Sequence, residues 1–490
     1  MTSDAEAAIP AGQISPLMPH LIIVPLIIAC ALFMENLDST VISTALPAIA
    51  LDIHEDPIAL KLALTSYLLT LAVFIPISGW TADRFGARTV FRVAIVIFTA
   101  GSALCGSATS LLDFVIYRII QGIGGAMMTP VGRLVILRLV PKHELVSALA
   151  WLVVPALIGP LIGPPLGGFI TTYFSWRWIF WINVPIGALG IVLATRYIEN
   201  IRERSVPPLD GRGFVLSGIA LAGLAFGFTT IGQHFMPTSI SLALLATGTA
   251  ALIAYVLHAR ATPFPLLDLR LLSIPTFRAS VGGGSLFRIG IGAMPFLLPL
   301  MFQIGFGMSP LQSGLLTFVG AIGAMVMRAS AATILRRFGI KRVVMINVVA
   351  ASSFIAACAL FRPDTPYAFI LFVLLVGGFF RALQFTSLNS LAFADLGTSE
   401  MSQATSFTSV AQQISITAGV ATAALAIDGV RFLRGDTVLT AGDFAPAFVI
   451  VGLVSLSSIF FLLPLPTNAG ASLTAPPPEE APLPEAEKEI

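Results

Sequence analysis

Several ionisable residues lie inside long apolar stretches of the sequence, among them Glu35 and Asp38 in the first stretch and Arg118 in the fourth. An ionised carboxylate in hydrocarbon is costly, so such a group pairs with a cation, faces water or holds a proton. At about 1.5 Å of rise per residue, Asp38 and Arg118 reach similar depths, which allows them to interact. These residue types favour a proton-binding site, and the alternative is a static structural ion pair.

Glu35 precedes Asp38 by three residues, so both carboxyl groups lie on one face of a helix. Two neighbouring carboxylates raise each other's proton affinity, which suits a site that takes up and releases protons. Equally, Glu35 could line a cavity and have no part in coupling.

The elements that must position these residues are membrane-spanning helices. Of the 490 residues 56% are hydrophobic and 11% are charged, and the mean hydropathy is +0.93. The net charge of +2 indicates no nucleic-acid partner. A helix that crosses a bilayer needs about 20 apolar residues. We therefore expect an all-α polytopic membrane protein with fourteen spans at 21–47, 60–82, 90–109, 111–138, 146–171, 177–197, 213–232, 240–258, 276–304, 310–334, 342–361, 366–392, 404–427 and 444–463.

The distribution of basic residues predicts the orientation of these spans. Connections from even to odd spans carry sixteen Lys and Arg, including Arg84, Lys142 and Arg204, whereas the opposite connections carry five. Because cytoplasmic loops are enriched in Lys and Arg, we expect both termini in the cytoplasm of a bacterial inner-membrane protein. The segment 1–20 has no basic region typical of a signal peptide, and the Pro- and Glu-rich tail 464–490 is expected to be disordered.

A short internal repeat suggests how the spans are organised. Residues 84–88 (RFGAR) reappear as residues 337–341 (RFGIK), 253 residues later and at the same kind of loop. Parallel repeats of this kind are a transporter architecture, with the substrate site between the halves. We expect an N-terminal six-helix half at 21–197, a linker with two extra helices at 198–260, and a C-terminal six-helix half at 261–463.

Several motifs resemble those of one family, in the same order along the chain. The loop 79–88 (GWTADRFGAR) resembles the signature loop of the major facilitator superfamily. Residues 37–41 (LDSTV), 118–122 (RIIQG), 159–168 (GPLIGPPLGG) and 176–185 (WRWIFWINVP) are similar to motifs of its fourteen-span drug:proton antiporters, the EmrB/QacA type. The resemblance extends from residue 21 to residue 463 and implies the major facilitator fold.

The resemblance also implies roles for individual residues. Asp38, with Glu35, would bind the coupling proton, and Arg118 would modulate its charge. The loop 79–88 would act as a conformational switch, and Gly79 and Gly86 would give its turn backbone freedom. The residues expected to form this switch are Gly79, Asp83, Arg84, Gly86 and Arg88. The fifth span would be the antiporter gate helix through Gly159, Gly163, Pro164, Gly167 and Gly168, although the glycine stripe alone could serve only for helix packing.

The C-terminal half departs from the pattern of a cation exporter. Arg288 and Arg381 lie deep in their spans, and no carboxylate in this half lies equally deep. These arginines could bind an anionic group or pair with carbonyl groups. Other candidates for the substrate cavity are Gln303, Gln384, Asn389 and Gln412.

The sequence thus predicts a monomeric proton-coupled efflux transporter that exports hydrophobic or amphipathic small molecules by alternating access. The chain has no phosphate-binding GxxxxGK[ST] motif and no metal-ligating cluster, so no cofactor, metal or enzymatic activity is expected. One alternative is an exporter of a specific organic anion or metal-chelating metabolite. The other is an uncoupled channel or lipid scramblase.

Overall fold

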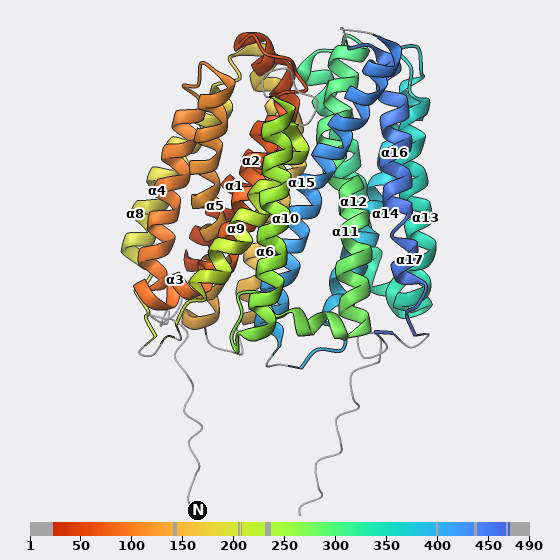
Figure 1. Ribbon diagram of the computed structural model, residues 1–490. Coiled ribbons are helices and arrows are strands. Elements are labelled where there is room, and N and C mark those ends of the chain that lie inside the picture. The colour runs from red at the N-terminus through yellow and green to blue at the C-terminus, as the bar shows by residue number, and fades with distance from the viewer. Residues whose placement is uncertain are drawn as a thin grey trace, which may run out of the picture. The chain divides into compact units, whose positions relative to one another are not determined.

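A computed structural model shows helices at all fourteen predicted spans (Figure 1). It describes residues 23–140, 145–203, 206, 208–230, 237–397, 400–435, 439–466 and 469–470, without the side chains of 145–157 and Ser402. The predicted segment 1–20 lies outside these residues, as do Lys142, Arg204 and all but five residues of the predicted tail 464–490. No β-strand occurs in the described ranges.

The first ten α-helices follow the predicted spans with small shifts at their ends. The second span is interrupted by a 3-10 turn at Pro76, and the sixth is divided after Trp181. The elements are α1 (Val24–Asp52), α2 (Lys61–Phe74), η2 (Ile75–Ile77), α3 (Ser78–Phe85), α4 (Ala87–Cys105), α5 (Leu111–Leu139), α6 (Leu145–Tyr173), α7 (Trp178–Trp181), α8 (Asn183–Tyr197), α9 (Gly211–Thr230) and α10 (Thr238–Ala261).

The remaining spans follow after a short 3-10 helix, η4 (Leu269–Ser273). The ninth span continues into a π-helical turn, and the thirteenth is longer than predicted because its helix runs on to Arg434. The elements are α11 (Pro275–Leu300), η5 (Met301–Gly305), α12 (Pro310–Phe338), α13 (Ile340–Ala357), η6 (Cys358–Leu360), α14 (Tyr367–Phe393), α15 (Met401–Arg434), η7 (Ala441–Asp443), α16 (Phe444–Leu456) and α17 (Ile459–Leu462).

Thirteen spans in the described part of the chain are long and apolar enough to cross a membrane. The fifth predicted span corresponds to α6, which is 29 residues long and has no charged residue in its sequence. Helix ends follow local rules: α5 begins at Ser110, whose side chain accepts a hydrogen bond from the backbone N–H of Asp113. A glycine in the left-handed region, Gly435, ends α15.

The helices form two compact units. One comprises residues 1–252 and 307–318, and the other comprises residues 253–306 and 319–490. In the first unit α1 packs on α6, and α5 packs on α2 and α4. Its apolar core is built from α1, α2, α4 and α5, with Phe91, Phe98 and Met128 completely buried. The predicted division at 197 and 261 stays a prediction.

The second unit repeats the helix order of the first at the offset of 253 residues. Ala87 begins α4 and Ile340, 253 positions later, begins α13; each follows a glycine with positive φ, Gly86 and Gly339. The packing repeats as well, because α11 packs on α15 and α13 packs on α14. In the same way α1 corresponds to α11, and α5 corresponds to α14.

Candidate functional site

Asp38 lies at the centre of a buried polar network in the first unit. Its Oδ2 accepts a hydrogen bond of 2.6 Å from Arg118 Nη1, and both side chains are about 1% exposed. Its Oδ1 accepts hydrogen bonds from Gln121 Nε2 at 2.9 Å and from Asn183 Nδ2 at 3.1 Å. The carboxylate therefore has three donors, and the guanidinium balances its charge in a site closed to water.

Further contacts hold the donors of this network in place. Arg118 Nη1 also donates to Gln121 Oε1 at 2.7 Å, and its guanidinium lies 4.1 Å from the centre of the Tyr67 ring. Asn183 Nδ2 is 3.0 Å from Ser102 Oγ, which itself donates to the Phe180 carbonyl. The network thus joins α1, α2, α4, α5 and α8, and a substitution of Asp38 would disturb contacts among all five helices.

Four members of this network are not among the residues predicted from the sequence: Gln121, Asn183, Tyr67 and Ser102. Gln121 follows Arg118 by three residues and therefore shares its helical face, a signal that could have revealed it. Asn183 and Tyr67 come from other helices and meet Asp38 and Arg118 only through tertiary packing.

Glu35 has a different environment from Asp38, although it lies one turn away on the same helix. Its Oε2 accepts a hydrogen bond of 2.7 Å from the hydroxyl of Thr129 on α5, and the side chain is half-buried. No ion pair joins Glu35 to a cation of the described residues. Glu35 is thus a membrane-embedded carboxyl group with a neutral hydrogen-bond partner.

The glycine stripe of α6 faces α1. A Cβ atom on Gly163 would lie 2.1 Å from Thr40 Oγ1, and one on Gly167 would lie 2.4 Å from the carbonyl oxygen of Val41. A Cβ on Gly159 would lie 3.0 Å from the backbone nitrogen of Leu37. These three glycines allow the two backbones to approach more closely than any side chain permits.

The other antiporter-motif residues contact the first turns of α12. A Cβ on Gly168 would lie 2.4 Å from the carbonyl oxygen of Pro310. A Cβ on Gly314 would lie 2.2 Å from the carbonyl oxygen of Pro164, so Gly314 extends the close-packed seam on the α12 side. Leu311 donates its backbone N–H to Thr172 Oγ1 at 3.1 Å. The motif therefore fixes the position of α6 against α1 and against the start of α12.

The loop between α3 and α4 is held by a cluster of charges. Arg138 Nη2, at the end of α5, donates to Asp83 Oδ1 at 2.6 Å and lies 3.0 Å from Glu203 Oε1. The backbone N–H of Glu203 donates to the Asp83 carbonyl, and that of Ala87 donates to the Ile201 carbonyl. The segment 198–203 after α8 thus lies along the loop and contributes a second acid.

The glycines and arginines of this loop are not equivalent. The prediction that Gly79 gives the turn its freedom is wrong, because Gly79 lies exposed within helix α3, and a Cβ at its position would have no atom within 4 Å. Only Gly86 has positive φ, at 94°. Arg84 is exposed, whereas Arg88 Nη1 donates to the Ile198 carbonyl at 3.3 Å. The turn therefore depends on Gly86 alone.

In the second unit two of the predicted cavity residues meet. Arg288 Nη2 on α11 donates to Asn389 Oδ1 on α14 at 2.7 Å, and the arginine is 2% exposed. Arg381 lies two turns before Asn389 on α14. Gln384 is fully buried, where it accepts a hydrogen bond from Asn347 of α13. Gln303 lies in η5 and Gln412 lies half-buried on α15.

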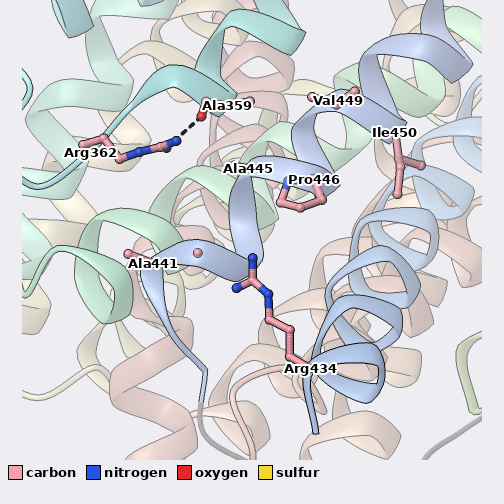
Figure 2. Close-up of a pocket in the computed structure, with 9 residues that line it drawn as sticks. Ala359, Arg362, Arg434, Ala441, Ala445, Pro446, Val449 and Ile450 are labelled. Atoms are coloured by element: carbon pink, nitrogen blue, oxygen red, sulfur yellow. Dashed lines mark hydrogen bonds between the residues drawn. The ribbon is translucent and has the colours of Figure 1, made fainter. Parts of the chain in front are cut away.

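A cavity of about 530 Å³ opens elsewhere in the second unit (Figure 2). Its apolar wall comes from α16, including Pro446 and Val449, and two arginines lie at its edge. Arg362 donates to the Ala359 carbonyl, and Arg434 forms an ion pair of 3.1 Å with Asp443. None of the cavity residues predicted from the sequence lines it.

Comparison with protein families identifies the fold and class of this chain. The sequence model described as Major Facilitator Superfamily matches residues 28–420, which is most of the protein. The chain belongs to the major facilitator superfamily. This major facilitator protein is a transporter, and its many spanning helices make it a multi-pass protein of the bacterial inner membrane.

Relatives named for multidrug resistance and for transport match most of this major facilitator protein. It is 38% identical over 399 residues to the "Putative multidrug resistance protein MdtD" of Pectobacterium atrosepticum, covering 81% of this chain and 85% of the relative. It is 34% identical over 449 residues to the "Probable transport protein HsrA" of Haemophilus influenzae, covering 92% of this chain and 97% of the relative. The family predicted from the motifs is therefore correct.

Solved structures share the major facilitator fold at low sequence identity. A POT family transporter in complex with 5-aminolevulinic acid is similar with a TM-score of 0.66 at 14% identity, covering 90% of this chain and 95% of that one. A D-xylose-proton symporter is similar with a TM-score of 0.64 at 16% identity, covering 92% and 99%. At such identities the likeness concerns the fold alone.

Proposed function

We propose that this transporter exports hydrophobic or amphipathic small molecules from the cytoplasm in exchange for protons, by alternating access. The observation that carries the proposal is the pair of carboxyl groups on α1, Glu35 and Asp38, within a membrane-spanning helix. Acidic groups at this depth are costly to keep and are typical of proton pathways in transporters. The relatives named for multidrug resistance support the choice of substrate class and direction.

The two carboxyl groups have separate parts in this proposal. Protonating Asp38 in the described conformation would leave the Arg118 guanidinium buried without its counter-charge, at a cost of about 3–5 kcal/mol. Among the described residues, Glu35 accepts a side-chain hydrogen bond from the neutral Thr129 hydroxyl alone, so it can take a proton without breaking an ion pair. Glu35 therefore binds the proton in this conformation, and Asp38 binds it only in one where Arg118 Nη1 has left Oδ2.

This division couples proton binding to conformation. A movement of α5 against α1 would change the Asp38–Arg118 contact and the Glu35–Thr129 contact together, because α1 supplies both acids and α5 supplies both partners. The proton affinity of the pair would then differ between the two conformations. Such a difference is what exchange requires, since a ligand shifts an equilibrium only through its differential affinity.

A proteoliposome assay tests the proposal. Purified protein is reconstituted with an internal pH dye, and a panel of amphipathic compounds is added to one side. We expect substrate-dependent proton movement in the wild type, and its loss in Glu35→Gln and Asp38→Asn. Glu55→Gln is the matched control, because Glu55 is an exposed acid just beyond α1 and should leave coupling unchanged.

Two results would contradict the proposal. Substrate-driven proton movement at the wild-type rate in Glu35→Gln and in Asp38→Asn would remove both acids from coupling. Proton movement that needs no substrate would favour the uncoupled channel. The proposed orientation, with both termini in the cytoplasm, is tested separately by reporter fusions to the two ends of the chain.

A further inference from the structure

Arg288 is a buried cation that has no acidic partner among the described residues. Its guanidinium donates to Asn389 Oδ1 from Nη2 and lies 5.4 Å from the centre of the Phe385 ring. Its Nε is buried and has no hydrogen-bond acceptor among the described residues. An amide oxygen and an aromatic face orient the guanidinium without cancelling its charge. Arg288 therefore presents a positive charge with an unused donor.

Arg381 adds a second cation, on the face of α14 that also carries Phe385 and Asn389. Arg381, Phe385 and Asn389 follow one another at intervals of four residues, so they form one stripe along the helix. The guanidinium fits against two glycines: Cβ atoms on Gly320 and Gly377 would lie 3.2 and 3.3 Å from its nitrogens. Its Nη1 is buried without an acceptor in the described part of the chain. Because Gly377 lies one turn before Arg381, this guanidinium points along α14 away from Phe385 and Asn389, the residues that contact Arg288.

Three carboxylates of the second unit are engaged elsewhere. Asp268 pairs with Arg270, Asp443 pairs with Arg434, and Asp395 accepts a hydrogen bond from Thr276. No ion pair of the described residues reaches Arg288 or Arg381. The contrast with the first unit is direct, because there the deep Arg118 is matched by Asp38. Two uncompensated guanidinium groups in hydrocarbon are costly unless a ligand or water satisfies them.

We propose that Arg288 binds the anionic group of an amphipathic substrate, a carboxylate in particular, and that Arg381 adds a second positive charge farther along the same stripe. A guanidinium has paired donors that match a carboxylate, and Phe385 supplies an apolar surface for the body of such a molecule. Asn389 is a positioning residue, which holds Arg288 against the stripe. This inference rests on the proposed function, since it names the chemical class of the exported molecule.

Two fluorescent probes of equal bulk and opposite charge test the site. The anion is 6-(dansylamino)hexanoate and the cation is dansylcadaverine, which carry the same dansyl group. Their binding to full-length protein in lipid nanodiscs is measured by fluorescence, with empty nanodiscs as the blank. We expect the wild-type protein to bind the anion more tightly than the cation.

Variants of the two arginines assign the preference to the site. Arg288→Gln should weaken anion binding about tenfold or more, because a hydrogen bond to a charged group is lost. Arg381→Gln should weaken anion binding less, because it removes only a more distant positive charge. Cation binding should stay within about twofold, which also shows that the variants are folded. Arg288→Lys keeps the charge but not the paired donors, so it should give an intermediate loss. Arg328→Gln is the matched control, because Arg328 is an exposed arginine of α12; it should change the binding of neither the anion nor the cation.

The outcomes separate this inference from the proposed function. If Arg288→Gln binds the anion as the wild type does, or if the wild type prefers the cation, the inference is wrong even where proton-coupled export is observed. If the wild type binds the anion and Arg288→Gln loses it, the inference stands even where no proton moves. If an arginine variant binds neither probe, Asn389→Ala is tested in its place. Asn389→Ala should weaken binding of the anion but not of the cation. If Asn389→Ala binds the anion as tightly as the wild type does, the proposed site is wrong.

Discussion

Glu35 of α1 and Arg288 of α11 occupy the same position of the internal repeat, 253 residues apart, with opposite charges. Each contacts the corresponding helix of its own unit: Glu35 accepts a hydrogen bond from Thr129 on α5, and Arg288 donates one to Asn389 on α14. The duplicated scaffold therefore holds an acid in one unit and a base in the other. The two units share one packing arrangement but carry opposite ionisable groups at this position.

The buried ion pair should dominate the stability of the first unit. Asp38→Asn leaves the Arg118 guanidinium without its counter-charge, so we expect a loss of about 3–5 kcal/mol. The double variant Asp38→Asn/Arg118→Gln removes both charges and should recover much of this loss. Thermal unfolding in detergent micelles measures the three free energies. Strictly additive losses would contradict the ion pair.

The charge cluster at the α3–α4 loop should affect turnover more than binding. Asp83→Asn and Glu203→Gln each remove one acid from Arg138, and both acids are partly exposed, so each change should cost about 1 kcal/mol or less of stability. We expect several-fold slower transport with little change in substrate affinity. Arg84→Gln, at an exposed position in the same loop, is the control. A large loss of affinity at unchanged turnover would place Asp83 near the substrate instead.

The antiporter-motif glycines should be intolerant of a methyl group. Gly167→Ala would place its Cβ 2.4 Å from the Val41 carbonyl oxygen, a backbone atom that cannot move alone. We expect a destabilisation of about 1–3 kcal/mol from this overpacking. Gly79→Ala is the matched control, because Gly79 is an exposed helical glycine with open space around it. Gly79→Ala should leave the free energy of unfolding unchanged or raise it by up to about 1 kcal/mol. If Gly79→Ala and Gly167→Ala lose the same stability, the close packing of α1 and α6 is not the cause.

The repeated turn glycines should differ in sensitivity. Gly86 and Gly339 both have positive φ, so alanine at either position costs about 1–2 kcal/mol of backbone strain. At Gly86 the new Cβ would also lie 2.3 Å from Asn200 Oδ1, whereas at Gly339 it would meet nothing within 4 Å. Gly86→Ala should therefore lower the unfolding temperature more than Gly339→Ala. The variant Gly86→Ala/Asn200→Ala should remove the difference, and a persistent difference would mean that Asn200 is not its cause.

Properties that depend on one helix at a time could be read from the sequence. Helix positions follow from apolar length, and the similar depths of Asp38 and Arg118 follow from a fixed rise per residue. The two residues do meet in the structure. A recurring sequence motif revealed the internal repeat, because residues 84–88 and 337–341 mark equivalent turns.

Properties that depend on helix rotation and packing could not be read in this way. Nothing in a linear sequence aims Asn183 at Asp38 or turns Gln384 toward Asn347 instead of Arg288. The prediction for Gly79 failed because a glycine next to a loop need not end a helix, and α3 continues through it to Phe85. Glu203 could not be foreseen because the segment after α8 meets the α3–α4 loop only in the folded chain.

The polar network around Asp38 contains a thiol. Cys105 Sγ lies 3.7 Å from Gln121 Oε1 and is completely buried, whereas Cys30 on α1 is exposed and Cys358 is buried in the other unit. An alkylating reagent can reach Cys105 only when the helices around the network separate. The rate at which Cys105 is labelled in a Cys30→Ser background therefore measures how often the network opens. The labelling rate of Cys358 reports in the same way on opening of the second unit.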